Sequence, residues 1–281
     1  MVFKFSEGLK EIYIKRLKID EENLYSAVEI ARKNKNINFE SSECKFNFEN
    51  TTKIFIEKVN LCLKKHKKFI LIIGDSHAVD LFNSVAHYSS HPFIISLAQG
   101  GCRPGLVNKS KKCHYQNSIN FVHFYKNHIK TIIFNQKGSY FLTNYKELPI
   151  LEKIFENTKL YLNFLKTDKK LPIFWFGPHA EPNIDLKKSV ILLQSLLVDN
   201  KKMEQLEIKG IYDLDKYLMQ NLEGSNIKYI SQLKLVNYNF SKDFYVNNNI
   251  TYSDTDHWSE FGEKYFGKRL IMNEEIKKIL N

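Results

Sequence analysis

The sequence predicts an α/β protein built on a parallel sheet that helices cover on both faces. Short apolar runs rich in β-branched residues alternate with segments whose apolar residues recur at helical spacing. Each crossover between parallel strands needs a long connection, usually a helix, so this alternation is typical of a parallel sheet. The chain has 281 residues, 43% of them hydrophobic, which is enough to bury a large core.

Strands and helices are expected in alternation from Phe69 onward. The expected strands are Phe69–Ile73, Phe93–Leu97, Thr131–Phe134 and Ile173–Phe176, with a weaker one at Lys228–Ser231. The expected helices are His77–Tyr88, Ser118–Ile129, Leu148–Leu165, Leu186–Val198, Tyr212–Leu222 and Ser259–Ile271. Before Phe69, a polar, Asn-rich stretch separates two helical segments, Leu24–Lys33 and Thr51–Lys68. We therefore expect a helical N-terminal extension over residues 1–68, packed on a main domain over residues 69–281.

The formal net charge of +11 favours acidic partners such as anionic glycans, phosphate-bearing carriers, membrane surfaces or nucleic acid. The lysines are scattered as pairs, and no dense basic helix, zinc finger or aromatic RNA-binding motif accompanies them, so nucleic acid is disfavoured. No apolar run approaches the length of a membrane span.

The most informative motif is the turn Gly74-Asp75-Ser76-His77, which follows the first apolar run. Ser76 lies where a buried strand gives way to a helix, among backbone N–H groups that lack a partner within the helix. An α/β protein places a nucleophile or binds an anion at such a junction. The simpler alternative is an Asp or Ser that caps the helix. No Gly-Lys pattern of a phosphate-binding loop is present, which disfavours phosphate binding.

Residues after the other strands should join the same site, because ligands of open α/β sheets bind beyond the carboxyl ends of the strands. The glycines Gly100-Gly101 follow the second strand, and Asn135 ends the third. His179 follows the fourth strand, and the run Asp254 to Trp258 precedes the last helix.

Together these residues supply what acyl transfer requires: a nucleophile, a base, an acid that orients the base, and donors for the oxyanion. Ser76 is the expected nucleophile, His257 the base and Asp254 the orienting acid. Asp256 competes with Asp254, but a spacing of three residues on a turn reaches the imidazole better than adjacency does. The expected oxyanion donors are the backbone N–H groups of Ser76 and of Gly101 or Gly100, with Gly101 preferred, and the side-chain amide of Asn135.

In these motifs the chain resembles the SGNH hydrolase superfamily of GDSL-type esterases and acyltransferases. The matching blocks, in order, are Gly74-Asp75-Ser76, Gly100-Gly101, Asn135 and Asp254-x-x-His257, over about residues 69 to 271. His77 after the serine, and a Gly-Cys-x-Pro turn with a second Cys soon after, resemble the SGNH domain of bacterial acyltransferase-3/SGNH proteins that O-acetylate surface polysaccharides. Phe134-Asn135-Gln136 departs from the usual Gly-x-Asn-Asp block.

The resemblance implies a three-layer, flavodoxin-like α/β/α fold, no metal or other cofactor, and acetyl groups on sugars as the substrate. We accordingly expect a serine-dependent O-acetyltransferase or acetylesterase that acts on bacterial surface carbohydrate, such as lipopolysaccharide, through an acyl-serine intermediate. The alternatives are a simple carbohydrate acetylesterase and a non-catalytic glycan-binding module that retains the fold. The expected partners are an acetylated or acetyl-accepting glycan and a membrane acyltransferase region that supplies acyl groups, with no nucleic acid.

Several side chains keep two interpretations. His77, His179 and Trp258 could contact substrate, or they could be structural. The four cysteines have no metal-type spacing, but Cys102 and Cys113 bracket one loop. A disulfide there would indicate an oxidising compartment, whereas two free thiols would favour the cytoplasm. An excised acyltransferase domain would lie on the periplasmic or exported side of the inner membrane, with a cytoplasmic enzyme as the alternative.

Overall fold

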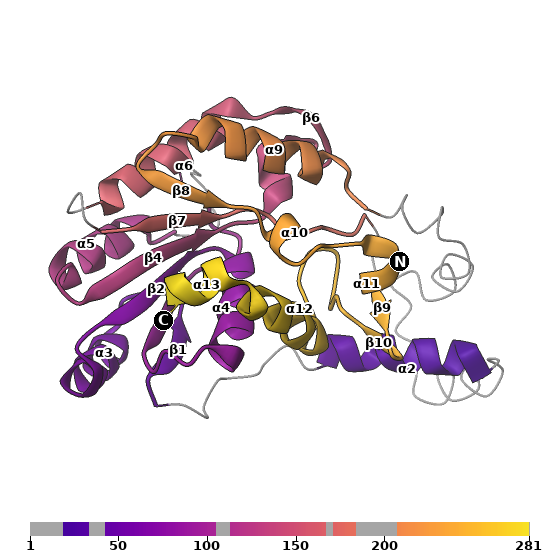
Figure 1. The fold of residues 1–281 in the computed structure, drawn as a ribbon, viewed down its shortest axis with the longest axis horizontal. Coiled ribbons are helices and arrows are strands. Elements are labelled where there is room, and N and C mark those ends of the chain that lie inside the picture. Colours follow the sequence, from indigo (N-terminus) through magenta and orange to yellow (C-terminus); the bar gives the residue numbers. More distant parts are fainter. Residues whose placement is uncertain (1–18, 34–42, 105–112, 167–170, 184–206, 281) are drawn as a thin grey trace.

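The computed structural model describes residues 19–33, 43–104, 113–166, 171–183 and 207–280, which form a six-stranded sheet between two layers of helices (Figure 1). The strand order is β1-β3-β2-β4-β7-β8, and every neighbouring pair is parallel. The strands are β1 Lys45–Phe48, β2 Phe69–Gly74, β3 Ile94–Ala98, β4 Ile129–Asn135, β7 Ile173–Phe176 and β8 Ile227–Ile230. The predicted α/β class with a central parallel sheet is confirmed.

Buried side chains form two clusters, one on each face of the sheet. The first cluster joins the sheet to α3 Lys53–His66, α5 Tyr115–Tyr125, α6 Glu152–Leu165 and α9 Gly210–Leu222. The second joins it to α2 Ile19–Lys33, α4 Ser76–Tyr88, α12 Glu260–Met272 and α13 Glu274–Leu280. In the central strands successive side chains enter opposite clusters, as Ile133 and Phe134 do, which explains why these strands are apolar throughout.

Short elements connect the main ones. After β4 come the 3₁₀ turn η1 Gly138–Phe141 and a small hairpin of β5 Leu142–Thr143 and β6 Glu147–Ile150. After β8 come α10 Gln232–Leu235, α11 Phe240–Asp243 and a second small hairpin of β9 Tyr245–Val246 and β10 Asn249–Ile250. Helix α2 runs alongside β10, at the right of Figure 1.

The main departure from the sequence-based expectation is β1, which lies in the segment expected to be polar and helical. It pairs in parallel with β3, and Phe46 packs against Phe55 of α3 and Phe93. The segment before Phe69 therefore contributes both a strand and a helix to the sheet domain. Another expected helix, Leu186–Val198, lies outside the described residues.

The chain reverses its direction of strand addition at β2, which places β3 on one side of β2 and β4 on the other. Crevices at such a switch point are where open α/β sheets bind ligands. Only Asp75 separates Ser76 from the end of β2, so the fold presents Ser76 at this point.

Gly74, the last residue of β2, is required by close packing against β4. Its φ is +156°, and a Cβ built on it would lie 1.8 Å from the carbonyl oxygen of Asn135. We expect Gly74→Ala to force apart the strands that carry the site and to lower the free energy of unfolding by about 3 kcal/mol. Chemical denaturation of the purified variant measures this loss. Wild-type stability in the variant would contradict the close approach of the two strands.

Candidate active site

Ser76 is the first residue of α4, and Asp75 caps that helix. The buried Asp75 carboxylate accepts a hydrogen bond from the backbone N–H of His77 at 2.9 Å through Oδ1 and from that of Lys137 at 3.0 Å through Oδ2. Burial raises the pKa of Asp75, and the charge of His77 opposes this. The Asp75 carboxylate thus fixes the serine turn to the backbone that follows β4.

His257 and Asp254 form the expected acid–base pair. Nδ1 of His257 lies 2.9 Å from Oδ1 and 3.0 Å from Oδ2 of Asp254. Oδ1 of Asp254 also accepts the backbone N–H of His257 at 2.9 Å, whereas the nearest oxygen of Asp256 lies 3.7 Å from Nδ1. Asp254 therefore orients the ring, as the three-residue spacing predicted.

The other ring nitrogen of His257, Nε2, is buried and has no hydrogen-bond partner in the described part of the chain. Burial lowers the pKa of His257, but the hydrogen bond with Asp254 and the charge of Asp80 outweigh it, so the net shift is upward. A ring whose Nδ1 is held by a carboxylate and whose Nε2 is unpaired has the geometry of a general base.

Asp256 instead anchors the turn that carries His257. Its Oδ2 lies 3.2 Å from Nε2 of His77 and 2.9 Å from Nζ of Lys137, and its backbone oxygen lies 2.8 Å from Nε2 of His179. Burial alone would raise the pKa of Asp256, but the hydrogen bond and charge of His77, with further help from His257 and Lys137, hold it well below its usual range. Three segments far apart in the sequence thus meet at one carboxylate.

His77 is a buried cation beneath the site. Its ring stacks on that of His179 at 4.3 Å between centroids and lies 5.4 Å from the ring of His257. Burial by itself lowers the pKa of His77, but the hydrogen bond with Asp256 and the charges of Asp75 and Glu181 raise it to about 9. Burial and the charge of His77 push the pKa of His179 well below its usual value, so a charged ring stacks on a neutral one.

His77, His179 and Trp258 are buried, with exposed fractions of 0%, 3% and 2%, and their expected contact with substrate stays a prediction. The ring of Trp258 stacks on His179 at 4.5 Å, and its backbone N–H donates to Asp80 at 3.0 Å. These side chains form the floor of the site and hold its position.

The side-chain amide of Asn135, the remaining expected oxyanion donor, makes hydrogen bonds at the end of β7. Its Nδ2 donates to the carbonyl oxygens of Phe176 at 3.0 Å and Gly177 at 3.1 Å, which uses both of its N–H groups. Gly100 lies close to Ser76, since a Cβ built on it would be 3.6 Å from Cβ of Ser76, and the next residue, Gly101, adopts a φ of +71°. The backbone N–H groups of Ser76 and of this loop stay the predicted donors.

Three residues that sequence reasoning missed support the site: Lys137, Asp80 and Glu181. Oε1 of the buried Glu181 accepts the backbone N–H groups of Gly138 at 2.7 Å and Ser139 at 3.1 Å. Glu181 therefore shapes the loop after β4, just as Asp75 and Asp80 hold the turns next to Ser76 and His257. The position of Glu181 just after the fourth strand was the only sequence signal for its role. Its hydrogen bonds join residues more than 40 positions apart, which no local pattern shows.

One group of described residues, His77, Asp256 and His257, has potential metal-ligand atoms within 4.8 Å of one another. The carboxylate of Asp256 is engaged by His77 and Lys137, however, and Nδ1 of His257 is engaged by Asp254. Each of these three side chains is thus already engaged by another charged group of the protein, which does not favour a metal at this position. The expected absence of a metal stays a prediction.

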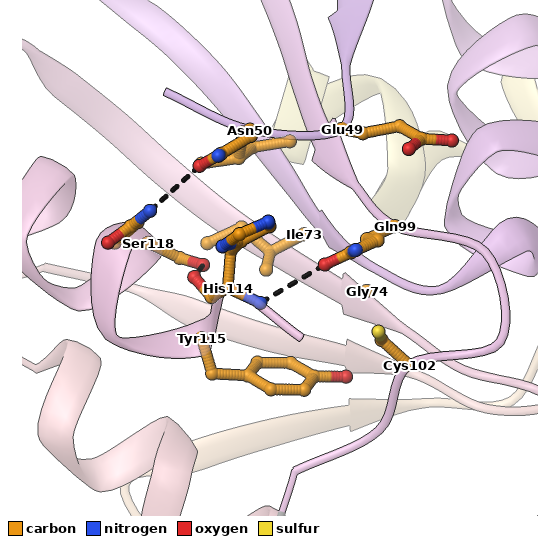
Figure 2. Close-up of a pocket in the computed structure, with 11 residues that line it drawn as sticks. Glu49, Asn50, Ile73, Gly74, Gln99, Cys102, His114, Tyr115 and Ser118 are labelled. Carbon is orange, nitrogen blue, oxygen red and sulfur yellow. Dashed lines mark hydrogen bonds between the residues drawn. The ribbon is translucent and has the colours of Figure 1, made fainter. Parts of the chain in front are cut away.

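Figure 2 shows a small pocket beside Gly74, the first residue of the turn that carries Ser76. It is lined by the ends of β1, β2 and β3, by Cys102 and by the start of α5, where the backbone N–H of His114 donates to Gln99 at 3.1 Å. A disulfide between Cys102 and Cys113 closes the loop at this wall. A second disulfide, Cys44–Cys62, which was not expected, joins the start of β1 to α3.

A family model described as "SGNH domain (fused to AT3 domains)" matches residues 43–271. The chain belongs to this SGNH domain family. The match includes β1 and α3 as well as the Ser76 and Asp254–His257 blocks. No curated protein matches the chain in sequence.

A solved structure shows the same fold. The SGNH domain is similar to the periplasmic domain of the lipopolysaccharide acetyltransferase of Salmonella ser. Paratyphi A, with a TM-score of 0.64 and 22% identity over 94% of this chain and 99% of that one. It is more distantly similar to a carbohydrate acetylesterase family member of Sinorhizobium meliloti, with a TM-score of 0.43 and 13% identity over 76% of this chain and 99% of that one. Within the described ranges, no helix has the length and apolarity to cross a membrane.

The buried charge on His77 should make stability depend on pH. The folded-state pKa of His77 is about 9, above its ordinary 6.5, so its contribution is complete below pH 6.5 and is lost as the pH rises to about 9. We expect the free energy of unfolding to fall across this window by at most about 3 kcal/mol, and His77→Gln to abolish this part of the fall. Urea denaturation of both proteins at several pH values measures the difference. Parallel curves for the two would contradict a charged His77.

Proposed function

We propose that this SGNH domain is a serine-dependent O-acetyltransferase or acetylesterase that acts on bacterial surface carbohydrate through an acyl-serine intermediate. One observation carries the proposal: Asp254 holds Nδ1 of His257, while Nε2 of His257 has no hydrogen-bond partner among the described residues. The ring of His257 lies 5.4 Å from that of His77, the residue next to Ser76. This is the acid–base half of a catalytic triad.

In the first half-reaction, Oγ of Ser76 attacks the carbonyl carbon of an acetyl ester and Nε2 of His257 takes the hydroxyl proton. Asp254 stabilises the imidazolium that forms, and the backbone N–H groups of Ser76 and of the Gly100-Gly101 loop stabilise the oxyanion. The tetrahedral intermediate collapses, the ester C–O bond breaks, and His257 returns its proton to the leaving oxygen. The acetyl group is now on Ser76.

In the second half-reaction, a hydroxyl group attacks acetyl-Ser76 and loses its proton to His257, which passes it to Oγ of Ser76 as the serine leaves. A sugar hydroxyl as acceptor gives an O-acetylated glycan, whereas water gives free acetate. The chemistry is the same in both cases, so transferase and esterase differ only in which acceptor reaches Ser76.

The family description, a domain fused to AT3 domains, supports a membrane acyltransferase region as the partner that supplies acyl groups. We place the domain on the periplasmic or exported side of the inner membrane. Two disulfides, Cys44–Cys62 and Cys102–Cys113, support this placement, since disulfides persist in oxidising compartments. The similar Salmonella structure is likewise that of a periplasmic domain, which agrees with this placement.

An acetyl-donor assay with and without a glycan acceptor tests the proposal. Acetylated sugar in the presence of acceptor supports the transferase, and release of acetate alone supports the simple acetylesterase. Glycan binding without turnover of any acetyl ester, by wild type and Ser76→Ala alike, would overturn the proposal in favour of the binding module.

A further inference from the structure

Three side chains that the proposed mechanism does not use as nucleophile, base or orienting acid converge beside the nucleophile turn. They are Arg103, which follows the glycine loop; Lys137, which follows β4; and Tyr140, in η1. The guanidinium carbon of Arg103 lies 4.7 Å from the centre of the Tyr140 ring, and Nζ of Lys137 lies 5.4 Å from the same centre. Two cations from separate loops therefore share one aromatic ring.

This cluster of Arg103, Lys137 and Tyr140 is attached to the catalytic turns. The backbone N–H of Lys137 donates to Oδ2 of Asp75 at 3.0 Å, one residue before Ser76, and Arg103 lies two residues after Gly101. Burial and the charges of Asp75 and Asp256 raise the pKa of Tyr140, and the charges of Lys137 and Arg103 lower it. The cluster is thus linked to the turn that carries Ser76 through Asp75.

The cluster holds one cation that a carboxylate pairs with and one that none of the described carboxylates pairs with. Lys137 pairs with Asp256 at 2.9 Å, and although burial lowers the pKa of Lys137, the charges of Glu181 and Asp256 outweigh it. No carboxylate within the described ranges pairs with Arg103. Its guanidinium group lies over the ring of Tyr140 instead. All three side chains of the cluster are partly exposed, 20% for Lys137, so an incoming group can reach them.

We propose that Arg103, Lys137 and Tyr140 form a subsite for an anionic group of the glycan, a carboxylate or a phosphate, on or next to the sugar whose ester is attacked. A guanidinium group matches the two oxygens of a carboxylate or phosphate, and a neighbouring aromatic face packs against a sugar ring. Tyr145, which is 54% exposed and meets the Tyr140 ring edge-on at 6.1 Å, extends that aromatic surface. The inference deepens the proposed function, on which it rests, by naming an acidic glycan as the substrate class.

The test compares kcat/KM for two substrates that differ only in charge: an O-acetylated uronic-acid oligosaccharide and its carboxyl-reduced, neutral counterpart. We expect the kcat/KM of wild type to be at least about tenfold higher for the anionic substrate than for the neutral one. In Arg103→Gln this ratio should fall about tenfold, and in Arg103→Lys it should fall less. Lys126→Gln, at the far end of α5, is the matched control and should keep the wild-type ratio. An acetylated sugar phosphate in a third arm distinguishes phosphate from carboxylate.

Two outcomes would overturn the subsite: a wild-type ratio near one, or a ratio that Arg103→Gln leaves unchanged. If wild type turns over no acetyl ester, the proposed function has failed, and calorimetric binding of the unacetylated uronic-acid oligosaccharide then decides the subsite by itself. The subsite is supported if added salt weakens this binding and if Arg103→Gln weakens it about tenfold. Equal affinity for the carboxyl-reduced oligosaccharide contradicts the subsite.

Discussion

Replacing Ser76 with alanine is expected to lower kcat for acetyl-ester turnover by at least about 10⁴-fold, because the variant cannot form the acyl intermediate. The variant should fold, because the turn is stabilised by the hydrogen bonds of Asp75 and by the close packing of Gly74. Neither of these involves the Ser76 hydroxyl. Initial rates on a chromogenic acetyl ester measure the loss, and thermal denaturation shows whether the variant is folded.

Ser241→Ala is the matched control for Ser76. The hydroxyl of Ser241 is at the surface of α11, where it donates to Asn239 at 2.8 Å, and its removal should leave the rate within about twofold of wild type. A Ser76→Ala protein that is folded and retains more than a tenth of the activity would show that another group performs the attack.

Asp254→Asn is expected to cause the second large effect, a loss of about 10³- to 10⁴-fold in kcat with little change in stability. An amide in this position can donate to Nδ1 of His257, which would leave the proton on Nε2 and prevent that atom from acting as the base. The partly exposed position of the Asp254 side chain, 23%, makes the change tolerable to the fold.

Asp256→Asn should show the opposite pattern, a large loss of stability with a smaller loss of kcat. It leaves the Asp254–His257 pair in place but removes the negative charge that faces His77 and Lys137, so a buried cation loses its partner. We expect a loss of about 3 kcal/mol in the free energy of unfolding and a smaller loss in kcat than for Asp254→Asn. If Asp256→Asn instead lost the greater part of kcat and kept its stability, the two aspartates would have been assigned the wrong roles.

Much of the site could be predicted because its residues lie at the ends of strands and helices, where the sequence pattern itself changes. Ser76 follows an apolar run and begins a helix, and the three-residue spacing of Asp254 and His257 favoured that pair over Asp256. The strand β1 was missed because Lys45–Phe48 is a short edge strand whose alternating side chains stand in a polar, Asn-rich stretch.

The supporting network could not be predicted, because it depends on contacts between residues far apart in the sequence. His77 and Asp256 are 179 positions apart, and nothing local to either shows that they meet. The same holds for Glu181, which binds the loop after β4, and for Asn135, whose amide hydrogen bonds go to the end of β7. Burial decided these roles, and burial of a polar side chain follows from the packing of the whole sheet.

Direct observation of the acyl-enzyme tests the central claim, that Ser76 carries the acetyl group between donor and acceptor. The domain is mixed with an acetyl ester, quenched with acid during turnover, digested and analysed by mass spectrometry. We predict that the peptide containing Ser76 gains the mass of one acetyl group, that Ser76→Ala shows no such gain, and that an acceptor lowers the amount trapped. Acetylation at another residue that turns over at the catalytic rate would contradict the account.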